Sequence, residues 1–165
     1  MNIYVIYTLA GNEQKIAREC RSKILLTGED VYVPLYNREK KKQGEIRVVQ
    51  SALFPGYIFF ETDDIESLKR RVKTIKDAPK LVGQGDEIYP LYEDEARLIY
   101  KLCGKAHILD ISKGVMEGQR VRVIQGPLLG MDALIVSVNR HKRTAVIEIE
   151  VLRRKIRVTV GLETI

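Results

Sequence analysis

The chain has 165 residues, of which 45% are hydrophobic and 30% charged, a composition typical of a folded protein rather than a disordered one. Its two cysteines and two histidines are too scattered for a disulfide framework or a zinc site, so we expect no metal, no cofactor and a reducing, cytoplasmic compartment. The net charge of +6 suggests an anionic partner such as a nucleic acid, although a solvated surface explains it equally well. No run approaches the ~20 apolar residues of a membrane span, and the first residues lack a signal-peptide pattern.

The first part of the chain predicts a strand, a helix and then further strands. Residues 2–8 alternate in hydrophobicity, which is typical of a strand. A helix is expected next, capped by Asn12 and running to about Thr27 with Gly28 ending it, because apolar residues recur at helical spacing. Further strands are predicted over residues 31–35 and 46–49, with a charge-rich loop or hairpin arm at residues 38–42.

The most distinctive stretch is Ser-Ala-Leu-Phe-Pro-Gly-Tyr-Ile-Phe-Phe-Glu, at residues 51–61. The Pro-Gly pair marks a turn, and the aromatic run after it predicts a strand that starts near Tyr57. On this strand Tyr57 and Phe59 share one face, while Ile58 and Phe60 share the other. Both faces are apolar, so the strand is either buried on both sides or keeps one face for a partner.

Two more helices are predicted before residue 104. Asp63 and Asp64 are suitable caps for the second helix, and the third is expected from Tyr92 to Leu102. The order of elements fits an α+β domain in which helices pack on an antiparallel sheet. Three helices of this size need not cover both faces of the sheet. An uncovered apolar face would be a docking surface, and its aromatic members would be Tyr7, Tyr57 and Phe59.

The pattern changes in the last third of the chain. Residues 105–116 lose clear periodicity and are interpreted as a linker, although several of them are apolar. From Glu117 onward, short alternating strands recur at about ten-residue spacing, which is typical of a small barrel. The predicted organisation is therefore an α+β domain at residues 1–104, a linker at 105–116 and an all-β barrel at 117–165.

Positive charge is concentrated in the predicted barrel. Residues 1–104 carry a balance of +1, whereas residues 117–165 carry +4. Cations two residues apart on a strand lie about 6.6 Å apart, a spacing that can follow successive phosphates. Either these side chains form an ordinary solvated face, or they converge on one wall that binds RNA. The candidate RNA-binding residues are Arg120, Arg122, Arg140, His141, Lys142, Arg143, Arg153, Arg154, Lys155 and Arg157.

Three stretches together resemble the NusG family of transcription elongation factors, and the resemblance covers essentially the whole chain. The opening Tyr-Val-Ile-Tyr-Thr at residues 4–8 is similar to the start of the family, as are Gly11, Glu13 and the helix after them. The Leu-Phe-Pro-Gly-Tyr-Ile-Phe stretch at residues 53–59 is similar to its most recognisable motif. Residues 118–130 resemble a KOW motif, the signature of a small SH3-like barrel.

The resemblance implies an N-terminal domain that docks on the clamp helices of RNA polymerase through an apolar pocket and suppresses pausing or termination. The matching pocket positions are Tyr7, Tyr57, Phe59 and Leu98. We also expect that the protein is not an enzyme. The residues agree, since no nucleophile–base pair, phosphate loop or metal-ligand spacing is recognisable.

The sequence departs from the usual family pattern near its end. Family members carry a Phe-Gly-Arg turn followed by Thr-Pro, whereas residues 152–157 here read Leu-Arg-Arg-Lys-Ile-Arg. This departure speaks against binding of ribosomal protein S10 or of Rho. It suggests a specialised paralog, most similar to LoaP, which is a processive antiterminator that recognises a hairpin in the nascent leader RNA. We expect such a protein to act as a monomer.

Two alternatives remain open from the sequence. An RfaH-like factor is recruited by non-template DNA, and the cations at residues 38–42 would then carry more of the contact. A ribosome-associated KOW protein would bind RNA without needing an exposed aromatic face. A regulatory hypothesis also follows from the apolar residues of the linker, namely that the KOW domain folds back over the polymerase-binding face when RNA is absent.

Overall fold

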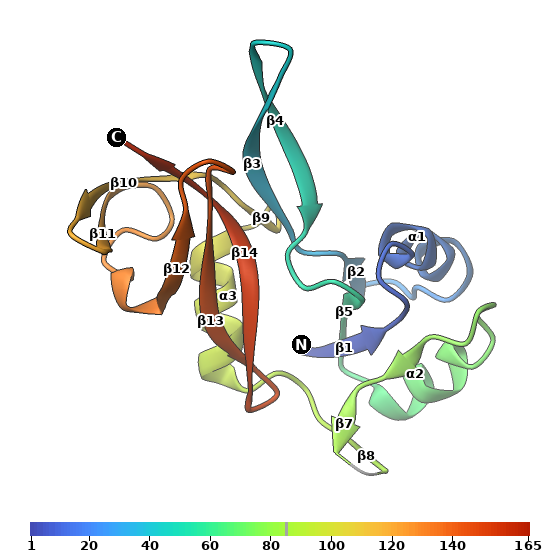
Figure 1. The fold of residues 1–165 in the computed structure, drawn as a ribbon. Coiled ribbons are helices and arrows are strands. Elements are labelled where there is room, and N and C mark those ends of the chain that lie inside the picture. Colours follow the sequence, from blue (N-terminus) through green and yellow to red (C-terminus); the bar gives the residue numbers. More distant parts are fainter. Residues whose placement is uncertain (85) are drawn as a thin grey trace.

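The centre of the N-terminal half is a four-stranded sheet in the order β2-β5-β1-β6 (Figure 1). The computed structural model describes residues 1–84 and 86–165. Strands β1 and β5 pair antiparallel along their full length, with Val5 opposite Phe59 and Tyr7 opposite Tyr57. The strands of this sheet are β1 (Asn2–Tyr7), β2 (Asp30–Tyr32), β5 (Tyr57–Thr62) and β6 (Lys80–Leu81).

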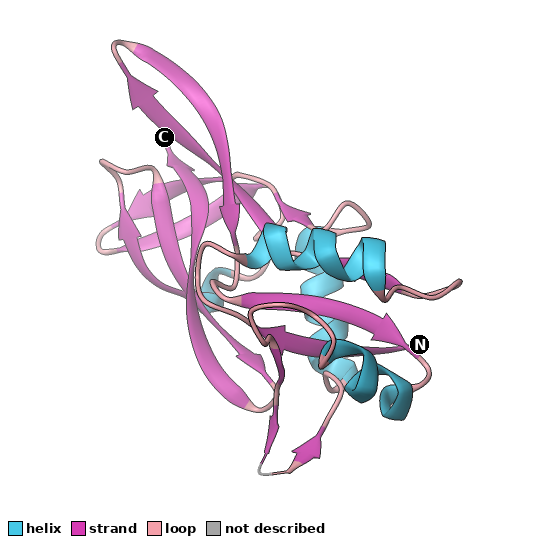
Figure 2. Ribbon diagram, turned by 90° about the vertical axis from the view of Figure 1, so that its right-hand side faces the viewer, coloured by secondary structure: helices cyan, strands magenta, loops and turns pink. Residues whose placement is uncertain are grey.

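Helices cover both faces of this sheet (Figure 2). On one face, α1 (Glu13–Lys23) and α2 (Ile65–Val72) enclose a core that contains Ile58 and Phe60. On the other face, α3 (Glu93–Cys103) packs over Val5 and Phe59 and lies on the side toward the C-terminal strands (Figure 1). The apolar residues on both faces of β5 are thus explained by burial on both sides.

The helix starts were predicted well, but the end of α1 was not. Asp64 caps α2, because its side chain accepts a hydrogen bond from the backbone N–H of Ser67 at 3.0 Å. Asn12 occupies the N-cap position of α1 without a side-chain hydrogen bond. Helix α1 ends at Lys23 rather than near Thr27. The reason is tertiary, since Arg71 donates a 2.6 Å hydrogen bond to the carbonyl of Ile24 and satisfies the end of the helix.

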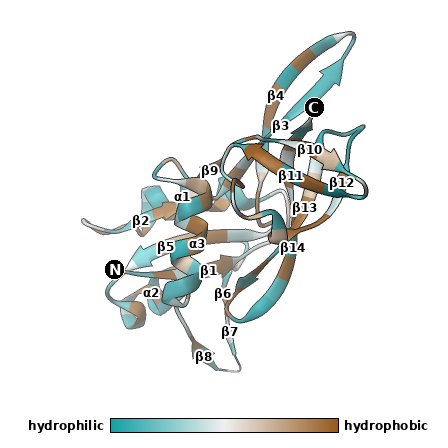
Figure 3. Ribbon diagram, turned by 90° about the vertical axis from the view of Figure 1, so that its left-hand side faces the viewer, coloured by the Kyte–Doolittle hydropathy of each residue, from teal (hydrophilic) through white to brown (hydrophobic). Residues whose placement is uncertain are grey.

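A long hairpin projects from the body of the molecule (Figure 1). It consists of β3 (Leu35–Lys42) and β4 (Glu45–Ala52), which pair over their full length. Residues 31–35 do not form one strand, because Pro34, which has no N–H to donate, separates β2 from β3. Figure 3 shows β3 hydrophilic toward the hairpin tip. A smaller hairpin contains β7 (Gly83–Gln84) and β8 (Glu87–Ile88).

The C-terminal part is a small barrel built on a five-stranded sheet in the order β11-β10-β14-β13-β12. Strand β14 is long enough to pair antiparallel with β13 and parallel with β10. Residues 105–116 are not extended freely, because they contain β9 (Ile108–Leu109), paired with β3, and most of β10. The barrel elements are β10 (Ser112–Glu117), β11 (Arg120–Gln125), the short 3-10 helix Asp132–Leu134, β12 (Ile135–Asn139), β13 (Thr144–Val151) and β14 (Arg154–Thr164).

The inward residues of the barrel follow the predicted alternation except on β12. Ile147, Val158 and Val160 are buried, while Lys155 and Arg157, at alternate positions of β14, are exposed. On β12, Val136 is 43% exposed, although the residue two positions further on, Val138, packs against the core. The pairing with β13 shifts between Ile135 and Ser137, so Val136 is left as the extra, unpaired residue and its side chain is not held on the inner face.

The two halves of the chain share one core. Buried residues of β1, β5 and α3 form a continuous hydrophobic cluster with buried residues of β11, β13 and β14. At β14, Gly161 lies against the backbone of β3, where a Cβ atom would meet the carbonyl oxygen of Asn37. The barrel is therefore packed directly on the N-terminal half, at α3 and β3.

Candidate nucleic-acid interface

Tyr7 and Tyr57 form an exposed aromatic pair, here called the aromatic edge, where β1 and β5 meet the Pro-Gly turn. Their ring centroids lie 6.2 Å apart with the rings at 75°, an edge-to-face contact. Tyr7 is 46% exposed, and Tyr57 is half-buried above Phe54. Leu9, which the sequence did not single out, is also exposed, two residues beyond Tyr7.

The Pro-Gly turn is what holds the aromatic edge in place. Gly56 has φ +87°, and a Cβ atom there would lie 2.7 Å from the Thr8 carbonyl oxygen and 2.9 Å from the Tyr7 ring. The buried carboxylate of Glu13 accepts hydrogen bonds from the N–H groups of Gly56 and Gly11, each at 2.8 Å. Only glycine fits this position, so the motif determines where both tyrosines stand.

The other two predicted polymerase-binding residues are less accessible. Phe59 is fully buried, with the Tyr32 ring edge-on at 5.9 Å. The expected exposure of Phe59 is wrong because α3 covers that part of the sheet. Leu98 is half-buried on α3 and packs against the shared core. Tyr7 and Tyr57 are thus the members of the predicted set that contact each other at the surface.

A buried carboxylate joins the barrel to α3. Glu95 is buried and accepts hydrogen bonds from the backbone N–H groups of Leu152 at 3.0 Å and Arg153 at 2.8 Å. Its Oε1 also accepts from the N–H of Tyr92 at 3.0 Å, at the start of its own helix. Leu152 and Arg153 both have positive φ in the turn between β13 and β14, which aims their N–H groups at this carboxylate.

Arg153 makes a second set of contacts across the same interface. Its guanidinium forms two 2.7 Å hydrogen bonds with Asp94 and lies 4.0 Å from the centroid of the Tyr92 ring. The hydrogen bonds from Arg153 hold the pKa of Asp94 below its ordinary value of 3.8. Arg153 therefore contacts α3, whereas Lys155 and Arg157 lie on the outer face of the barrel.

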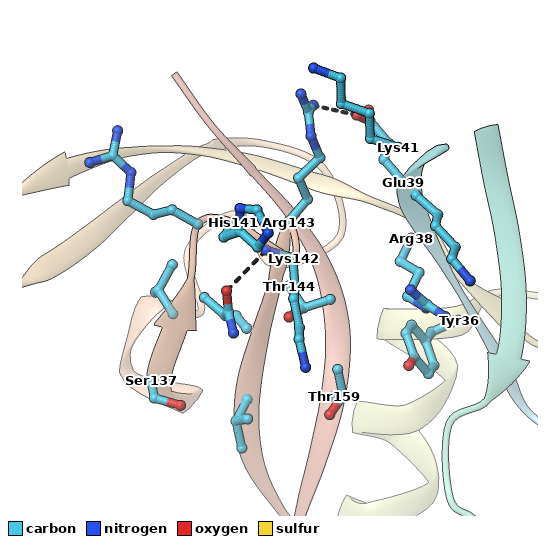
Figure 4. Close-up of a pocket in the computed structure, with 16 residues that line it drawn as sticks. Tyr36, Arg38, Glu39, Lys41, Ser137, His141, Lys142, Arg143, Thr144 and Thr159 are labelled. Atoms are coloured by element: carbon cyan, nitrogen blue, oxygen red, sulfur yellow. Dashed lines mark hydrogen bonds and ion pairs between the residues drawn. The ribbon is translucent and has the colours of Figure 1, made fainter. Parts of the chain in front are cut away.

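A cleft of about 1070 Å³ separates the β3–β4 hairpin from the turn between β12 and β13 (Figure 4). Arg143 crosses it at one end, with Nη1 2.7 Å from Glu39 Oε2. Four candidate RNA-binding residues line the cleft together, namely Arg140, His141, Lys142 and Arg143. The facing hairpin contributes Tyr36, Arg38, Glu39, Lys40 and Lys41.

The remaining candidate RNA-binding cations do not line this cleft. Arg122 is paired with Glu117 at 2.6 Å, and Arg157 with Glu148 at 3.4 Å. Arg120, Arg154 and Lys155 are exposed on strands β11 and β14. The candidate RNA-binding cations therefore converge only at the β12–β13 turn, and not along a whole wall of the barrel.

Several residues of the interface were not recognised from the sequence. The roles of Glu39, Asp94 and Glu95 between the two halves have no local signal in the sequence, because the barrel residues that they contact are more than 50 residues away in the chain. In the sequence the hairpin cations form only a charge run, which the RfaH-like alternative connects with DNA.

The described residues contain no cluster of three or more His, Cys, Asp or Glu side chains that could hold a metal ion. Among the helices that the structure describes, none is long and apolar enough to cross a membrane. Burial raises the pKa of the Cys20 thiol to about 11 and that of Cys103 to about 12, so both are protonated and poorly reactive at neutral pH.

Comparison with known proteins agrees with the fold and the motifs. Residues 1–100 match the family model described as transcription termination factor nusG. The transcription termination/antitermination protein NusG of Thermus thermophilus is 26% identical over 92% of this chain and 90% of its own length. The NusG protein of Bacillus subtilis is 29% identical over 86% of this chain and 84% of its own length. A solved structure of NusG from Thermotoga maritima, whose title refers to domain interaction, has a similar fold, with a TM-score of 0.56. The match covers 97% of this chain and 93% of that chain, at 18% sequence identity. The chain belongs to the NusG family.

Proposed function

We propose that this protein is a transcription elongation and processive antitermination factor that binds RNA polymerase and the nascent transcript. The aromatic edge would contact the clamp helices of the polymerase, and the basic side of the barrel would bind a hairpin in the leader RNA. Membership in the NusG family and the names of the similar proteins support the general role.

The observation that carries the polymerase contact is the exposure of Tyr7 beside Tyr57. A large aromatic side chain buries about 150–250 Å² when it is covered. Covering a few hundred Å² of apolar surface contributes several kcal/mol at about 25 cal/mol per Å², before the costs of association are subtracted. The glycine turn holds both rings in position beforehand, so little ordering remains when a partner binds.

RNA binding is supported by the cations around the β12–β13 turn. Arg140, His141 and Lys142 are exposed there, and attraction of such residues to phosphates falls as salt rises. Exposed histidine and arginine side chains also stack on the unpaired bases of hairpin loops. A specialised, LoaP-like role is supported by residues 152–157, which read Leu-Arg-Arg-Lys-Ile-Arg where the usual family pattern has a Phe-Gly-Arg turn.

The hairpin cations Arg38, Lys40 and Lys41 keep non-template DNA as a second candidate ligand, as in an RfaH-like factor. A purely ribosomal role is less well supported, because it gives no function to an aromatic edge held by a dedicated turn.

Capture of RNA polymerase core enzyme by the immobilised full-length chain tests the main proposal. Tyr7→Ala and Tyr57→Ala should each weaken capture, while Tyr100→Ala, at a tyrosine that is 56% exposed on α3, should not. Equal capture by all four proteins would refute the polymerase-binding role of the aromatic edge.

A further inference from the structure

We propose that the cleft between the β3–β4 hairpin and the β12–β13 turn is a composite RNA-binding site with one wall from each half of the chain. The hairpin wall consists of the lining residues 36 and 38–41, and the barrel wall of residues 137–146 and Thr159. This inference rests on the proposed RNA-binding function and deepens it, because it places half of the RNA contact outside the barrel.

The first argument is charge. The hairpin wall carries three Lys or Arg residues, and the barrel wall carries three more. Among the described residues that line the cleft, Glu39 is the single acidic one, and its charge is already matched by Arg143 at 2.7 Å. A cleft with cations on both sides and a low-dielectric body behind them concentrates positive potential, which attracts a polyanion.

The second argument is size and chemistry. At about 1070 Å³ the cleft exceeds the usual small-molecule site of about 300–1,000 Å³, and six Lys or Arg residues line it. Such a lining favours an extended anionic chain over a drug-like ligand. Besides the cations, the barrel wall offers hydroxyl and amide groups, from Ser137, Asn139, Thr144 and Thr159.

These neutral polar groups favour RNA over DNA. Hydroxyls and amides can hydrogen-bond to the 2′-hydroxyl that DNA lacks, and to the edges of unpaired bases. The exposed His141 ring can stack on such a base. A concave cleft between two projecting hairpins also suits a single-stranded loop better than a duplex, which is usually read by a helix or ribbon entering its groove.

The third argument is that contacts between the two halves set the distance between the walls. Arg143 bonds to Glu39 across the cleft. Below it, Gly161 of β14 lies so close to β3 that an added Cβ would meet the Asn37 carbonyl oxygen and lie 3.2 Å from the Arg38 Cα. RNA affinity should therefore depend on how the halves are packed, and not only on the cations of the barrel.

Fluorescence anisotropy with the full-length chain tests this site. The probe is a labelled pool of short RNA stem-loops with randomised loop sequences, and the matching DNA pool is measured alongside. Three double variants are compared with the unmodified chain, each of which removes two exposed cations. Lys40→Ala with Lys41→Ala alters the hairpin wall, Arg140→Ala with Lys142→Ala the barrel wall, and Lys73→Ala with Lys76→Ala a region outside the cleft.

Both wall variants should weaken RNA binding about fivefold or more, in keeping with the modest contribution of each exposed ion pair, while the control stays within about twofold. For every phosphate that a variant no longer neutralises, the slope of log affinity against log salt should also become shallower by about 0.7. If only the barrel variant binds RNA more weakly, the composite site is wrong but RNA binding by the barrel stands. If the unmodified chain binds no RNA, or binds DNA equally well, the RNA assignment itself is overturned, whatever the polymerase capture shows.

Gly161→Ala supplies a second test that removes no charge. The backbone φ of Gly161 is not in the left-handed region, so alanine causes no backbone strain within β14. The added methyl group instead presses on the backbone of β3 across the interface. Circular dichroism should show an unchanged content of secondary structure. Because the substitution changes the distance between the hairpin wall and the barrel wall, RNA affinity should fall by at least about fivefold. An unchanged affinity would overturn the composite site.

Discussion

Glu95 Oε2 lies 2.8 Å from the backbone nitrogen of Arg153, which is 58 residues further along the chain. The same carboxylate accepts from Leu152 and from Tyr92. It therefore stabilises the start of α3 and fixes the barrel turn on that helix. A buried carboxylate of this kind is satisfied only when the two halves are packed together.

Glu95→Gln should loosen the barrel from α3. The amide retains one acceptor oxygen but brings a donor toward the N–H groups of Leu152 and Arg153, so the packing should weaken by about 1–3 kcal/mol. Backbone 15N relaxation measures this directly, since two loosely connected halves tumble faster than one packed unit. Glu93→Gln on the same helix is the control, because its side chain is 91% exposed. Identical tumbling of the Glu95 variant and the unmodified chain would contradict the role of this carboxylate.

The contact between Asp94 and Arg153 makes the packing sensitive to acid. Hydrogen bonds from Arg153 hold the folded-state pKa of Asp94 below 3.8, so its contribution is fully present above pH 3.8 and is lost as pH falls through the lower folded value. A pH titration followed by 15N relaxation should therefore show loosening of the halves only below that pH. Asp94→Asn should remove the part of this acid-dependent loosening that comes from Asp94. The part that comes from other acidic residues, such as Glu150 at 3.5 Å from Arg153, should remain. The same acid dependence in both proteins would exclude Asp94 as its source.

The ion pair between Arg71 and Glu29 should make the N-terminal half sensitive to the loss of either partner. The side chains are only 15% and 7% exposed, and two hydrogen bonds of 2.7 and 2.8 Å join them. Burial opposes ionisation of Glu29, but the bonds from Arg71 and Thr62 prevail and hold its pKa below 4.5.

Arg71→Ala should lower the free energy of unfolding by about 3–5 kcal/mol, because it leaves a buried carboxylate without its partner. Urea denaturation measures the change. The neighbouring Arg70→Ala is the matched control, since Arg70 is exposed, and should stay within about 0.5 kcal/mol. A loss below about 1 kcal/mol for Arg71→Ala would show that water or another side chain replaces the arginine.

Gly56→Ala tests whether the turn positions the aromatic edge. Its Cβ would press on the Thr8 carbonyl oxygen and the Tyr7 ring, in addition to the strain of φ +87°. The expected cost is about 1–3 kcal/mol, or a Tm lower by about 2–4 °C per kcal/mol, together with weaker polymerase capture. Gly44→Ala has a similar φ of +82° but no atom within 4 Å of the added Cβ. Equal effects of the two substitutions would mean that the contact with Tyr7 is unimportant.

Local patterns in the sequence predicted most of the elements. The Pro-Gly turn, the strand at Tyr57 and the Asp64 cap are determined by neighbours in the chain, and the structure has all three. The end of α1 could not be predicted, because Arg71 completes it from 47 residues away. Likewise the shift within β12, which exposes Val136, depends on how the strand pairs with β13.

The candidate site was only partly predictable for the same reason. The cations at the β12–β13 turn and the tyrosines of β1 and β5 stand out in the sequence by residue type. Burial of Phe59 and the facing hairpin wall depend on how the two halves pack, and no local pattern reports that packing. The key contacts are made by single acidic residues, such as Glu39, whose partners are distant.

Crosslinking in a stalled transcription elongation complex tests the central claim most directly. A photoreactive amino acid is placed at Lys41 on the hairpin wall, at Lys142 on the barrel wall, or at Lys76 as a control, within the full-length chain. Crosslinks from both walls to the nascent RNA, with none from position 76, are the expected result. Crosslinks to DNA alone, or none to RNA from either wall while the protein is bound to polymerase, would contradict the proposal that this protein binds the transcript.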